Sequence, residues 1–251
     1  MALQKEFRVQ GDFLYKNRSY LPLFFLSAGL SVFLYGKYFE TVDSDTITSD
    51  FYLFVCLAIS LLGLLIRIFT VGHTPKNTSG RNTSSGQIAD ELNTTGIYST
   101  VRHPLYLGNF FMWLGVAMLT ENMWFTIAFI LLYWIYYERI MYAEENFLIL
   151  KFSNTYLNWA SRTPAFIPSL QNYESPKYSF SLKKVLKKEK NGLAAIFLIF
   201  WLFQWSENVV TQRKIFQLNL DFWFYAALVG SILYIILKIL KKKKLLQTIN
   251  R

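Results

Sequence analysis

The sequence predicts an all-α, polytopic membrane protein with about six transmembrane helices and both termini in the cytoplasm. The 251 residues are 53% hydrophobic and only 17% charged, whereas soluble domains are about 25% charged. Several apolar runs approach the roughly 20 residues that a spanning helix needs. The net charge of +10 comes from Lys and Arg residues that cluster in alternate segments of the chain, as in membrane proteins with basic cytoplasmic loops.

The apolar runs place the expected helices in order along the chain. The third and fourth runs are the shortest, about 17 residues each, and residues 121–123 join them, which predicts a tight helical hairpin. The fifth run loses its apolar character after Trp205, so it fits either a span or an interfacial helix. The six expected spans are Tyr20–Tyr38, Phe51–Phe69, Pro104–Thr120, Trp124–Ile140, Leu193–Val210 and Phe222–Leu240.

The basic residues favour six crossings over five. Cytoplasmic flanks carry the excess of Lys and Arg, and the basic segments are 1–19, 67–102, 139–190 and 238–251. Segments 40–50 and 121–123 carry no basic residue, and 206–220 carries only Arg213 and Lys214. Only six crossings put all four basic segments on one side. The expected location is therefore a bacterial cytoplasmic membrane, with the basic face in the cytoplasm.

The chain divides into three parts by composition. Residues 1–94 comprise N-terminal transmembrane helices and a polar cytoplasmic loop. The polar segment 71–97, which extends a few residues into the next part, is either a plain linker or a lid over a site. Residues 95–170 form a core that carries the polar motifs. Residues 171–251 comprise a basic linker and a C-terminal transmembrane hairpin, and the Lys-rich segment 174–190 is interpreted as a membrane-surface linker.

Charge and cysteine content exclude several classes of protein. The basic residues are dispersed over several loops, so no nucleic-acid partner is expected. The single cysteine, Cys56, excludes a disulfide framework and a multi-cysteine zinc site, and no metal is expected. The sequence does not predict the oligomeric state.

The first dense cluster of polar residues lies at 96–108, at the start of the third expected span. Pro104 suits the first turn of a helix, where its missing N–H costs nothing. Arg102 and His103 would then stand beside the free N–H groups of a helix N-terminus, a favourable place for an anion. The alternatives are a topogenic charge at Arg102 and a capping residue at His103. Four further residues offer backbone freedom or aromatic faces: Gly96, Gly108, Tyr98 and Tyr106.

The second cluster, residues 138–148, directly follows the fourth expected span. Ionisable residues at the end of a membrane helix need partners or water, which draws attention to Arg139, Glu144 and Glu145. Residues 141–159 are expected to continue as an amphipathic helix. The alternative to a functional site is a set of surface ion pairs of little energetic value.

Together the two clusters describe an anion cradle with aromatic faces and carboxylates at the cytoplasmic membrane boundary. S-adenosylmethionine fits this chemistry, because it carries a carboxylate, a sulfonium that favours aromatic faces and ribose hydroxyls that favour a carboxylate. A nucleotide would also fit a pocket that is both basic and acidic.

Two ordered motifs make the chain resemble the integral-membrane methyltransferases of the isoprenylcysteine carboxyl methyltransferase and phospholipid methyltransferase superfamily. The first motif has the spacing G-x-Y-x-x-V-R-H-P-x-Y-x-G and the second R-I-x-x-x-E-E-x-x-L-x-x-x-F-x-x-x-Y. The segment Arg162–Pro168 also resembles the ending of that family. The matching residues are Gly96, Tyr98, Val101, Arg102, His103, Pro104, Tyr106, Gly108, Arg139, Ile140, Glu144, Glu145, Leu148, Phe152 and Tyr156.

The resemblance implies methyl transfer from S-adenosylmethionine to a lipid or other membrane-partitioned acceptor. By similarity, the first motif and Glu145 bind the cofactor, Glu144 and Glu145 contact cofactor or acceptor, and Arg139 orients the acceptor; these three are the implied catalytic residues. Residues 169–251 continue beyond the usual end of the family core and leave the acceptor open, as well as whether oxygen, nitrogen or sulfur is methylated.

Two other functions are compatible with parts of this pattern. A sterol-reductase-like membrane enzyme that uses NADPH carries a similar Arg-His-Pro-x-Tyr-x-Gly stretch, usually followed by an acidic residue, whereas Asn109 follows Gly108 here. A non-catalytic membrane scaffold or a transporter is the second alternative. Transporters place polar groups near the midplane, whereas here they gather at the cytoplasmic ends of the helices.

Overall fold

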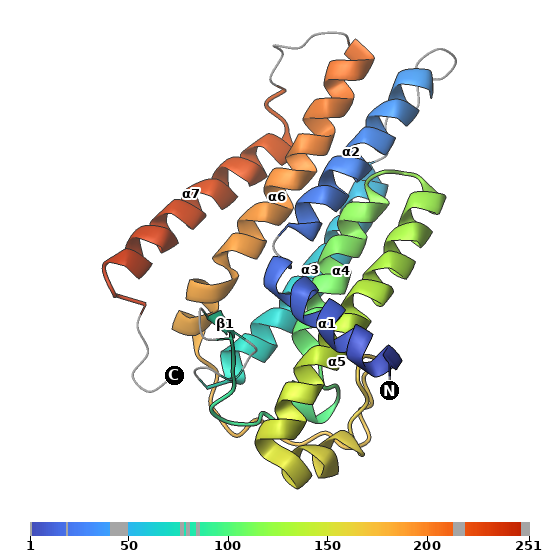
Figure 1. The fold of residues 1–251 in the computed structure, drawn as a ribbon. Helices are drawn as coiled ribbons and strands as arrows, with labels where there is room; N and C mark the ends of the chain where they lie inside the picture. The colour runs from blue at the N-terminus through green and yellow to red at the C-terminus, as the bar shows by residue number, and fades with distance from the viewer. Residues whose placement is uncertain are drawn as a thin grey trace.

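The computed structural model describes residues 2–18, 20–40, 50–75, 78, 81–83, 86–212 and 219–246. Within these ranges the chain is mainly helical, which confirms the all-α part of the predicted fold class, and one short antiparallel hairpin pairs Arg81 with Ile88. The elements are α1 (Ala2–Asn17), α2 (Leu21–Glu40), α3 (Asp50–His73), β1 (Arg81–Thr83), β2 (Gly86–Ile88), the 3₁₀ helix η1 (Ile97–Ser99), α4 (Pro104–Met118), α5 (Met123–Ala160), α6 (Leu182–Gln212) and α7 (Phe222–Lys242) (Figure 1). The loops 41–49 and 213–218, used above to assign sides, lie outside the described residues.

Among the described residues, four helices are long and apolar enough to cross a membrane by length and composition: α2, α3, α6 and α7. Helix α4 is apolar but has only 15 residues. Helix α5 contains the fourth expected span and continues without a break through the charged residues that follow it. The crossing number of six and the sidedness of the termini therefore stay predictions.

Helix α5 joins two elements that the sequence analysis treated separately, the fourth span and the amphipathic helix 141–159. It starts after Asn122, whose side chain accepts a hydrogen bond from the Phe125 N–H at 2.9 Å, as an N-cap does. Near its end Ser153 leaves the helical region, with φ 46° and ψ −124°. The kink redirects the last turns, and Trp159 Nε1 donates to the Tyr98 carbonyl at 3.2 Å.

Two helical segments differ from the sequence interpretation. Helix α1 covers most of segment 1–19, which the sequence analysis counted only as a basic segment. It packs on α5 at Gly11, where a Cβ would lie 2.2 Å from the Arg139 carbonyl oxygen. Helix α6 begins at Leu182, inside the predicted linker 174–190. Lys and Leu are good helix formers, and the Ser181 N–H donates to the Gly72 carbonyl at 2.9 Å, which docks the start of α6 on the end of α3.

Helices α3 and α4 pack at backbone contact distance because glycines line their interface. A Cβ at Gly63 would lie 2.4 Å from the Gly108 carbonyl oxygen, and one at Gly115 would lie 2.4 Å from the Cys56 carbonyl oxygen. Gly108 and Gly115, seven residues apart, thus share the face of α4 that packs on α3. This interface continues into a buried core that α2, α3, α4, α6 and α7 share, and it brings the first polar cluster beside α3.

The polar segments gather at one end of the molecule. Figure 1 shows the β1–β2 hairpin, the end of α3, the start of α6 and the C-terminal half of α5 together at this end. Bulky apolar side chains are exposed elsewhere, on the outer faces of α2, α5 and α7. The helices thus present an apolar exterior and concentrate the polar groups where the candidate site lies.

Candidate functional site

A cavity of about 340 Å³ lies at the polar end of the molecule, within the range of small-molecule sites. Its walls come from α3, the segment after β2, η1, the start of α4, the middle of α5 and the start of α6. Six of the residues that the sequence analysis selected line it: Tyr98, Arg102, His103, Pro104, Tyr106 and Glu144. The cavity therefore brings together residues of both predicted clusters, which are separated in the chain by the α4–α5 hairpin.

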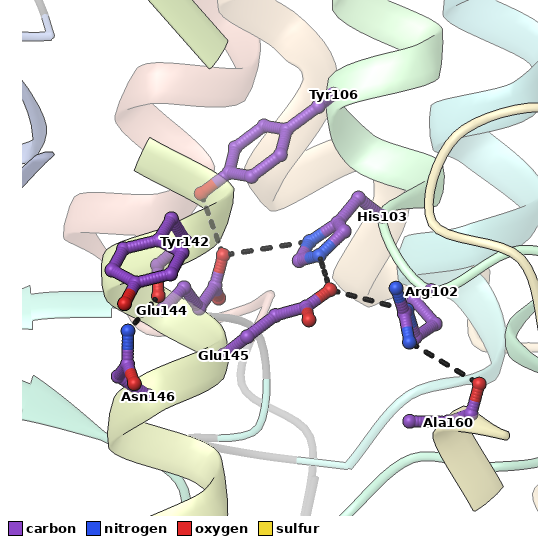
Figure 2. Close-up of polar contacts among 8 residues, drawn as sticks. All are labelled: Arg102, His103, Tyr106, Tyr142, Glu144, Glu145, Asn146 and Ala160. Carbon is purple, nitrogen blue, oxygen red and sulfur yellow. Dashed lines mark hydrogen bonds and ion pairs between the residues drawn. The ribbon is translucent and has the colours of Figure 1, made fainter. Parts of the chain in front are cut away.

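His103 lies between the two adjacent glutamates, as Figure 2 shows. Its Nε2 is 2.9 Å from Glu145 Oε1, and its Nδ1 is 3.7 Å from Glu144 Oε2. The imidazole also stacks on Tyr106, with 5.5 Å between the ring centroids and 14° between the planes. The Tyr106 hydroxyl donates to Glu144 at 2.8 Å. Both ring nitrogens thus face carboxylates, which fixes the orientation of the imidazole at the cavity wall.

Arg102 stands on the other side of Glu145. Its Nε is 3.1 Å from Glu145 Oε1, and its Nη1 donates to the Ala160 carbonyl at 3.2 Å. Glu145 does not line the cavity itself but ties Arg102 and His103 to α5 (Figure 2). Glu145 thus accepts a hydrogen bond from His103 Nε2 and forms an ion pair with Arg102, so it orients the two residues that do reach the cavity.

The sequence analysis expected free N–H groups beside Arg102 and His103 at the helix N-terminus, but the N–H groups of these two residues are themselves hydrogen-bonded. They donate to the carbonyls of Pro164 and Ala165, at 2.9 and 3.2 Å. The Ser169 N–H donates in the same way to the Thr100 carbonyl at 2.9 Å. The segment that follows α5 therefore folds back onto the start of α4 and takes up these donors, so at these two positions side chains, and not backbone amides, are left to bind an anion.

The electrostatics of the cluster keep Glu145 charged. Burial raises its pKa, but the hydrogen bond and charge of His103 and the charge of Arg102 outweigh burial, and the net shift is downward. Burial and the Glu144 charge raise the pKa of Tyr98. Burial and the nearby Glu145 charge likewise raise the pKa of Tyr156. The tyrosines of this region therefore stay neutral hydrogen-bonding groups.

Gly96 and Gly108, two of the expected cofactor contacts, do not line the cavity. Gly96 has φ +64°, a backbone region that favours glycine, and it lets the chain turn into η1. Gly108 faces α3, where a Cβ would lie 2.5 Å from Arg67 Cγ. Both glycines act through backbone geometry, because each permits a turn or a helix contact that positions the cavity wall.

Arg139 is directed away from the cavity. Its guanidinium lies 3.8 Å from the centroid of the Phe7 ring on α1, and its Nη1 contacts Glu138 at 2.6 Å. The helical period explains this placement. Tyr137 and Glu144 are seven residues apart and share the cavity face of α5, whereas Arg139 is rotated by about 200° from Tyr137. The structure thus gives Arg139 no contact with the cavity and places it in the α1–α5 interface.

The sequence analysis missed the contribution of α6 to the cavity. Lys184, Lys188 and Glu189 line the wall, although this segment had been interpreted as a linker. Glu189 receives two hydrogen bonds from Arg67 of α3, at 2.8 and 2.9 Å, and Arg67 Nη1 donates to Asn109 Oδ1 at 2.7 Å. A helical period in the Lys-rich stretch, with Val185 and Leu186 between the charges, was the signal that could have predicted a packed helix.

The segment after β2 forms the outer wall of the cavity. Glu91 and its neighbours line this cavity and also a second one of about 260 Å³. The Glu91 carboxylate is held by Lys177 at 2.5 Å and by the Tyr178 hydroxyl at 2.6 Å, and these hydrogen bonds lower the pKa of Glu91. Of the two interpretations of segment 71–97, a lid agrees better with this placement than a plain linker.

Among the described residues, no group of three or more His, Cys, Asp or Glu side chains is arranged to hold a metal ion. The groups at the cavity that can contact a ligand are cationic (Arg102, Lys188), aromatic (Tyr98, Tyr106) and acidic (Glu144). This donor set suits an organic zwitterion, because it offers partners for a carboxylate, for a positive centre and for hydroxyl groups.

Residues 51–155 match the model of the phospholipid methyltransferase family. The nickel-cobalt-cadmium resistance protein NccN of Alcaligenes xylosoxydans xylosoxydans is 36% identical over 91 residues, 36% of this chain and 42% of that protein. The protein-S-isoprenylcysteine O-methyltransferase of Schizosaccharomyces pombe is 40% identical over 78 residues, which are 31% of this chain and 33% of that protein. The enzyme of the same name from Saccharomyces cerevisiae is 31% identical over 103 residues, which are 41% of this chain and 42% of that protein. The chain thus spans less than half the length of these relatives, and no solved structure matches it.

Proposed function

We propose that this protein is an integral-membrane methyltransferase, on the premise that its residues 51–155 match the phospholipid methyltransferase family. The donor is S-adenosylmethionine, and the acceptor is a lipid or another amphiphilic molecule that enters from the membrane. The single observation that carries this proposal is the arrangement of His103 between Glu144 and Glu145 at the wall of the cavity, with Arg102 beside it.

The polar groups at the cavity fit this cofactor. Arg102 lines the cavity. Its guanidinium contacts Glu145 through Nε and the Ala160 carbonyl through Nη1, and a guanidinium has five N–H donors, so further donors are left for an anionic group. The cationic side chain of Arg102 would hold the carboxylate of the cofactor, and the faces of Tyr98 and Tyr106 would lie against its cationic part.

S-adenosylmethionine, when bound, supplies the methyl group as an electrophile. The chain's own residues then bind and orient the cofactor and the acceptor, and they exclude water. His103, held by Glu145, and the ring of Tyr106 form one wall, while Pro104 fixes the first turn of α4. Of the carboxylates that line the cavity, Glu144 lies beside His103 and Tyr106, and we assign it the contact with the acceptor. Arg139 acts indirectly, by holding α1 against α5.

The role of Glu144 depends on whether the acceptor must lose a proton when it is methylated. An amine acceptor must lose a proton during methylation, and a carboxylate at hydrogen-bond distance can accept it; Glu144 is the group placed for this role. A carboxylate or thiolate acceptor needs no base, and Glu144 would then serve only to orient it.

The proposed protein crosses a bacterial cytoplasmic membrane six times, with both termini and the cavity on the cytoplasmic side. The basic residues of α6 and α7 and the polar segments that enclose the cavity support this orientation, since cytoplasmic flanks are rich in Lys and Arg. A soluble cofactor would reach the cavity from that side.

Binding of the cofactor tests the proposal directly. Detergent-purified protein should bind S-adenosylmethionine by calorimetry, and His103→Ala and Glu145→Ala should each weaken binding by about tenfold or more, because each leaves charged partners unpaired. Glu138→Ala is the matched control: Glu138 is an exposed carboxylate of the same helix, 45% accessible, and its loss should leave binding unchanged. Binding of NADPH in place of S-adenosylmethionine would favour the reductase alternative and overturn the proposal.

The acceptor can be identified with the same preparation. The protein is incubated with methyl-labelled S-adenosylmethionine and a total lipid extract, and labelled products are identified by mass spectrometry. A labelled lipid that is absent with His103→Ala is the expected result. Label found only in water-soluble products would exclude a membrane-partitioned acceptor.

A further inference from the structure

Helices α6 and α7 form an antiparallel pair whose cytoplasmic end collects lysines. The two helices approach closely at Gly230, where a Cβ would lie 3.8 Å from Ala194 Cα. One helical turn from this contact, Lys190 of α6 lies opposite Tyr234 of α7. Because the helices are antiparallel, the next turns bring Lys187 and Lys238 to the same end. Figure 1 shows this end of α6 and α7 on the same side of the molecule as the β1–β2 hairpin.

Two ammonium groups converge on one aromatic ring at this place. Lys190 Nζ lies 5.9 Å and Lys238 Nζ 5.6 Å from the centroid of the Tyr234 ring. Lys190 is only 7% exposed, and its Nζ donates to Asn191 Oδ1 at 3.0 Å and to the Lys187 carbonyl at 3.2 Å. Lys241, one turn after Lys238, adds a third positive charge on this face of α7.

These lysines form no ion pair with a carboxylate of the described residues. In the part of the chain that the structure describes, no carboxylate oxygen lies within 4 Å of the Nζ atoms of Lys190, Lys238 or Lys241. Glu189, the adjacent acidic residue, directs its carboxylate to Arg67 instead. Lys190 is buried, whereas Lys238 and Lys241 are exposed. Burial lowers the pKa of Lys190, and the two exposed charges lower it further by like-charge repulsion; the Tyr234 face and the neutral acceptors of Lys190 offset only part of that cost.

We propose that Lys190, Lys238 and Lys241, with Asn191 and the ring of Tyr234, form a specific binding site for the headgroup of an anionic phospholipid. The phosphodiester would lie between the three ammonium groups, and the Asn191 amide offers a further hydrogen bond. This site lies on α6 and α7, outside the family-matched region 51–155, and its function is independent of methyl transfer.

A lipid is favoured over a soluble anion because apolar surface adjoins the lysines. The outer face of α7 beside Tyr234 and Lys238 exposes Ile235, Ile236 and Ile239, each about half accessible. Acyl chains can cover such a face, while the headgroup stays at the level of the lysines, and long Lys side chains reach this interface readily. Charge and apolar surface are thus arranged in the order in which a phospholipid presents its headgroup and chains.

Native mass spectrometry of the full-length protein in detergent tests this site, with phosphatidylglycerol as the probe. The variant with Lys190→Gln, Lys238→Gln and Lys241→Gln should bind phosphatidylglycerol about tenfold or more weakly than the unchanged chain. The variant with Lys242→Gln, Lys243→Gln and Lys244→Gln is the matched control: it removes the same charge from the same end of α7 and should retain most of the binding. Phosphatidylcholine should bind the unchanged chain much more weakly.

Three results would overturn the proposal. Equal loss in the two triple variants would mean diffuse attraction to negative charge and no site. Displacement of the lipid by an equal concentration of inorganic phosphate would mean a site for a free anion. Absence of saturable phosphatidylglycerol binding would exclude a site altogether. The thermal unfolding midpoint distinguishes a variant that is misfolded from one that has lost only the lipid site. Lys190→Gln should raise this midpoint slightly, because like-charge repulsion is relieved, while lipid binding falls.

Discussion

At the residue scale, the site depends on one histidine held between two carboxylates. Glu145 contacts both His103 and Arg102, and Glu144 contacts Tyr106 and faces the other nitrogen of His103. Adjacent residues on a helix point about 100° apart, so Glu144 and Glu145 approach the imidazole from different directions. This divides their work: Glu144 reaches the cavity and Glu145 supports the residues that do.

The stability of the protein at acidic pH should depend on the charge of Glu145. Its pKa is lowered in the folded protein, so its contribution is fully present above its ordinary pKa of about 4.3 and is lost as the pH falls through the lowered value. Glu145→Gln should therefore destabilise the protein by about 1–3 kcal/mol near neutral pH, and the difference should shrink as the pH falls below about 4. Thermal unfolding in detergent between about pH 7 and pH 3 measures this.

Glu138→Gln serves as the control, because Glu138 is 45% exposed and exposed ion pairs contribute little. The thermal unfolding midpoint of Glu138→Gln should equal that of the unchanged chain over the whole pH range. A constant difference between the unchanged chain and Glu145→Gln, independent of pH, would contradict the assigned charge.

Only the site residues that belong to a local sequence motif could be predicted from the sequence. Arg102, His103 and Glu145 carry chemistry that suits a site whatever their neighbours, and the structure brings them together. Arg67 and Asn109 carry no such local signal, because their roles depend on the packing of three helices. For Arg139, residue type and the family resemblance indicated a role at the acceptor, while its position on α5 directs its side chain to Phe7; its role stays a prediction.

At the element scale, α6 is part of the cavity wall. Lys184 donates from its ammonium group to the carbonyls of Thr74 and Pro75 and to the Thr74 hydroxyl, and so satisfies free acceptors at the C-terminal end of α3. Glu189 binds Arg67 about one turn further along α6. Two attachments to α3 on one face of α6 fix the Lys-rich segment as a helix, which charge composition alone could not predict.

The pair of Arg67 and Glu189 should be sensitive to removal of one partner. The side chain of Glu189 is 5% and that of Arg67 22% exposed, and loss of one member of a buried pair costs about 3 kcal/mol because the other charge stays unpaired. Glu189→Met should therefore lower the thermal midpoint in detergent and weaken binding of S-adenosylmethionine.

Adding Arg67→Met to Glu189→Met should recover most of the lost stability, since an apolar pair can replace a buried ion pair at little cost. Lys183→Met is the control for loss of a charge elsewhere on α6, since Lys183 lies in the first turn of the helix and is exposed. Equal stability of the single and double variants would show that the two side chains are not coupled.

At the scale of the whole molecule, polar chemistry and basic charge occupy one end, and apolar side chains cover the outer faces of the helices. Hydropathy alone supports four spanning helices, because α4 is short and α5 carries charged residues in its middle. The distribution of Lys and Arg adds α4 and α5 as a hairpin, since the turn between them has no basic residue. Composition predicts the helical class, but the crossing number rests on this charge argument.

Single cysteines can decide between six crossings and five. Cys56 is buried, so Cys56→Ser gives a background without an intrinsic thiol. Cysteines at exposed positions in each connection, Met123→Cys and Leu220→Cys, should react with a membrane-impermeant maleimide applied to intact cells. Leu3→Cys, Leu170→Cys and Leu245→Cys should react only after permeabilisation; these five positions are 75%, 64%, 61%, 78% and 59% exposed in the order named. With five crossings, Leu220 would be protected in intact cells or Leu245 would be labelled, and the cytoplasmic lysine end of α6 and α7 could not exist as proposed.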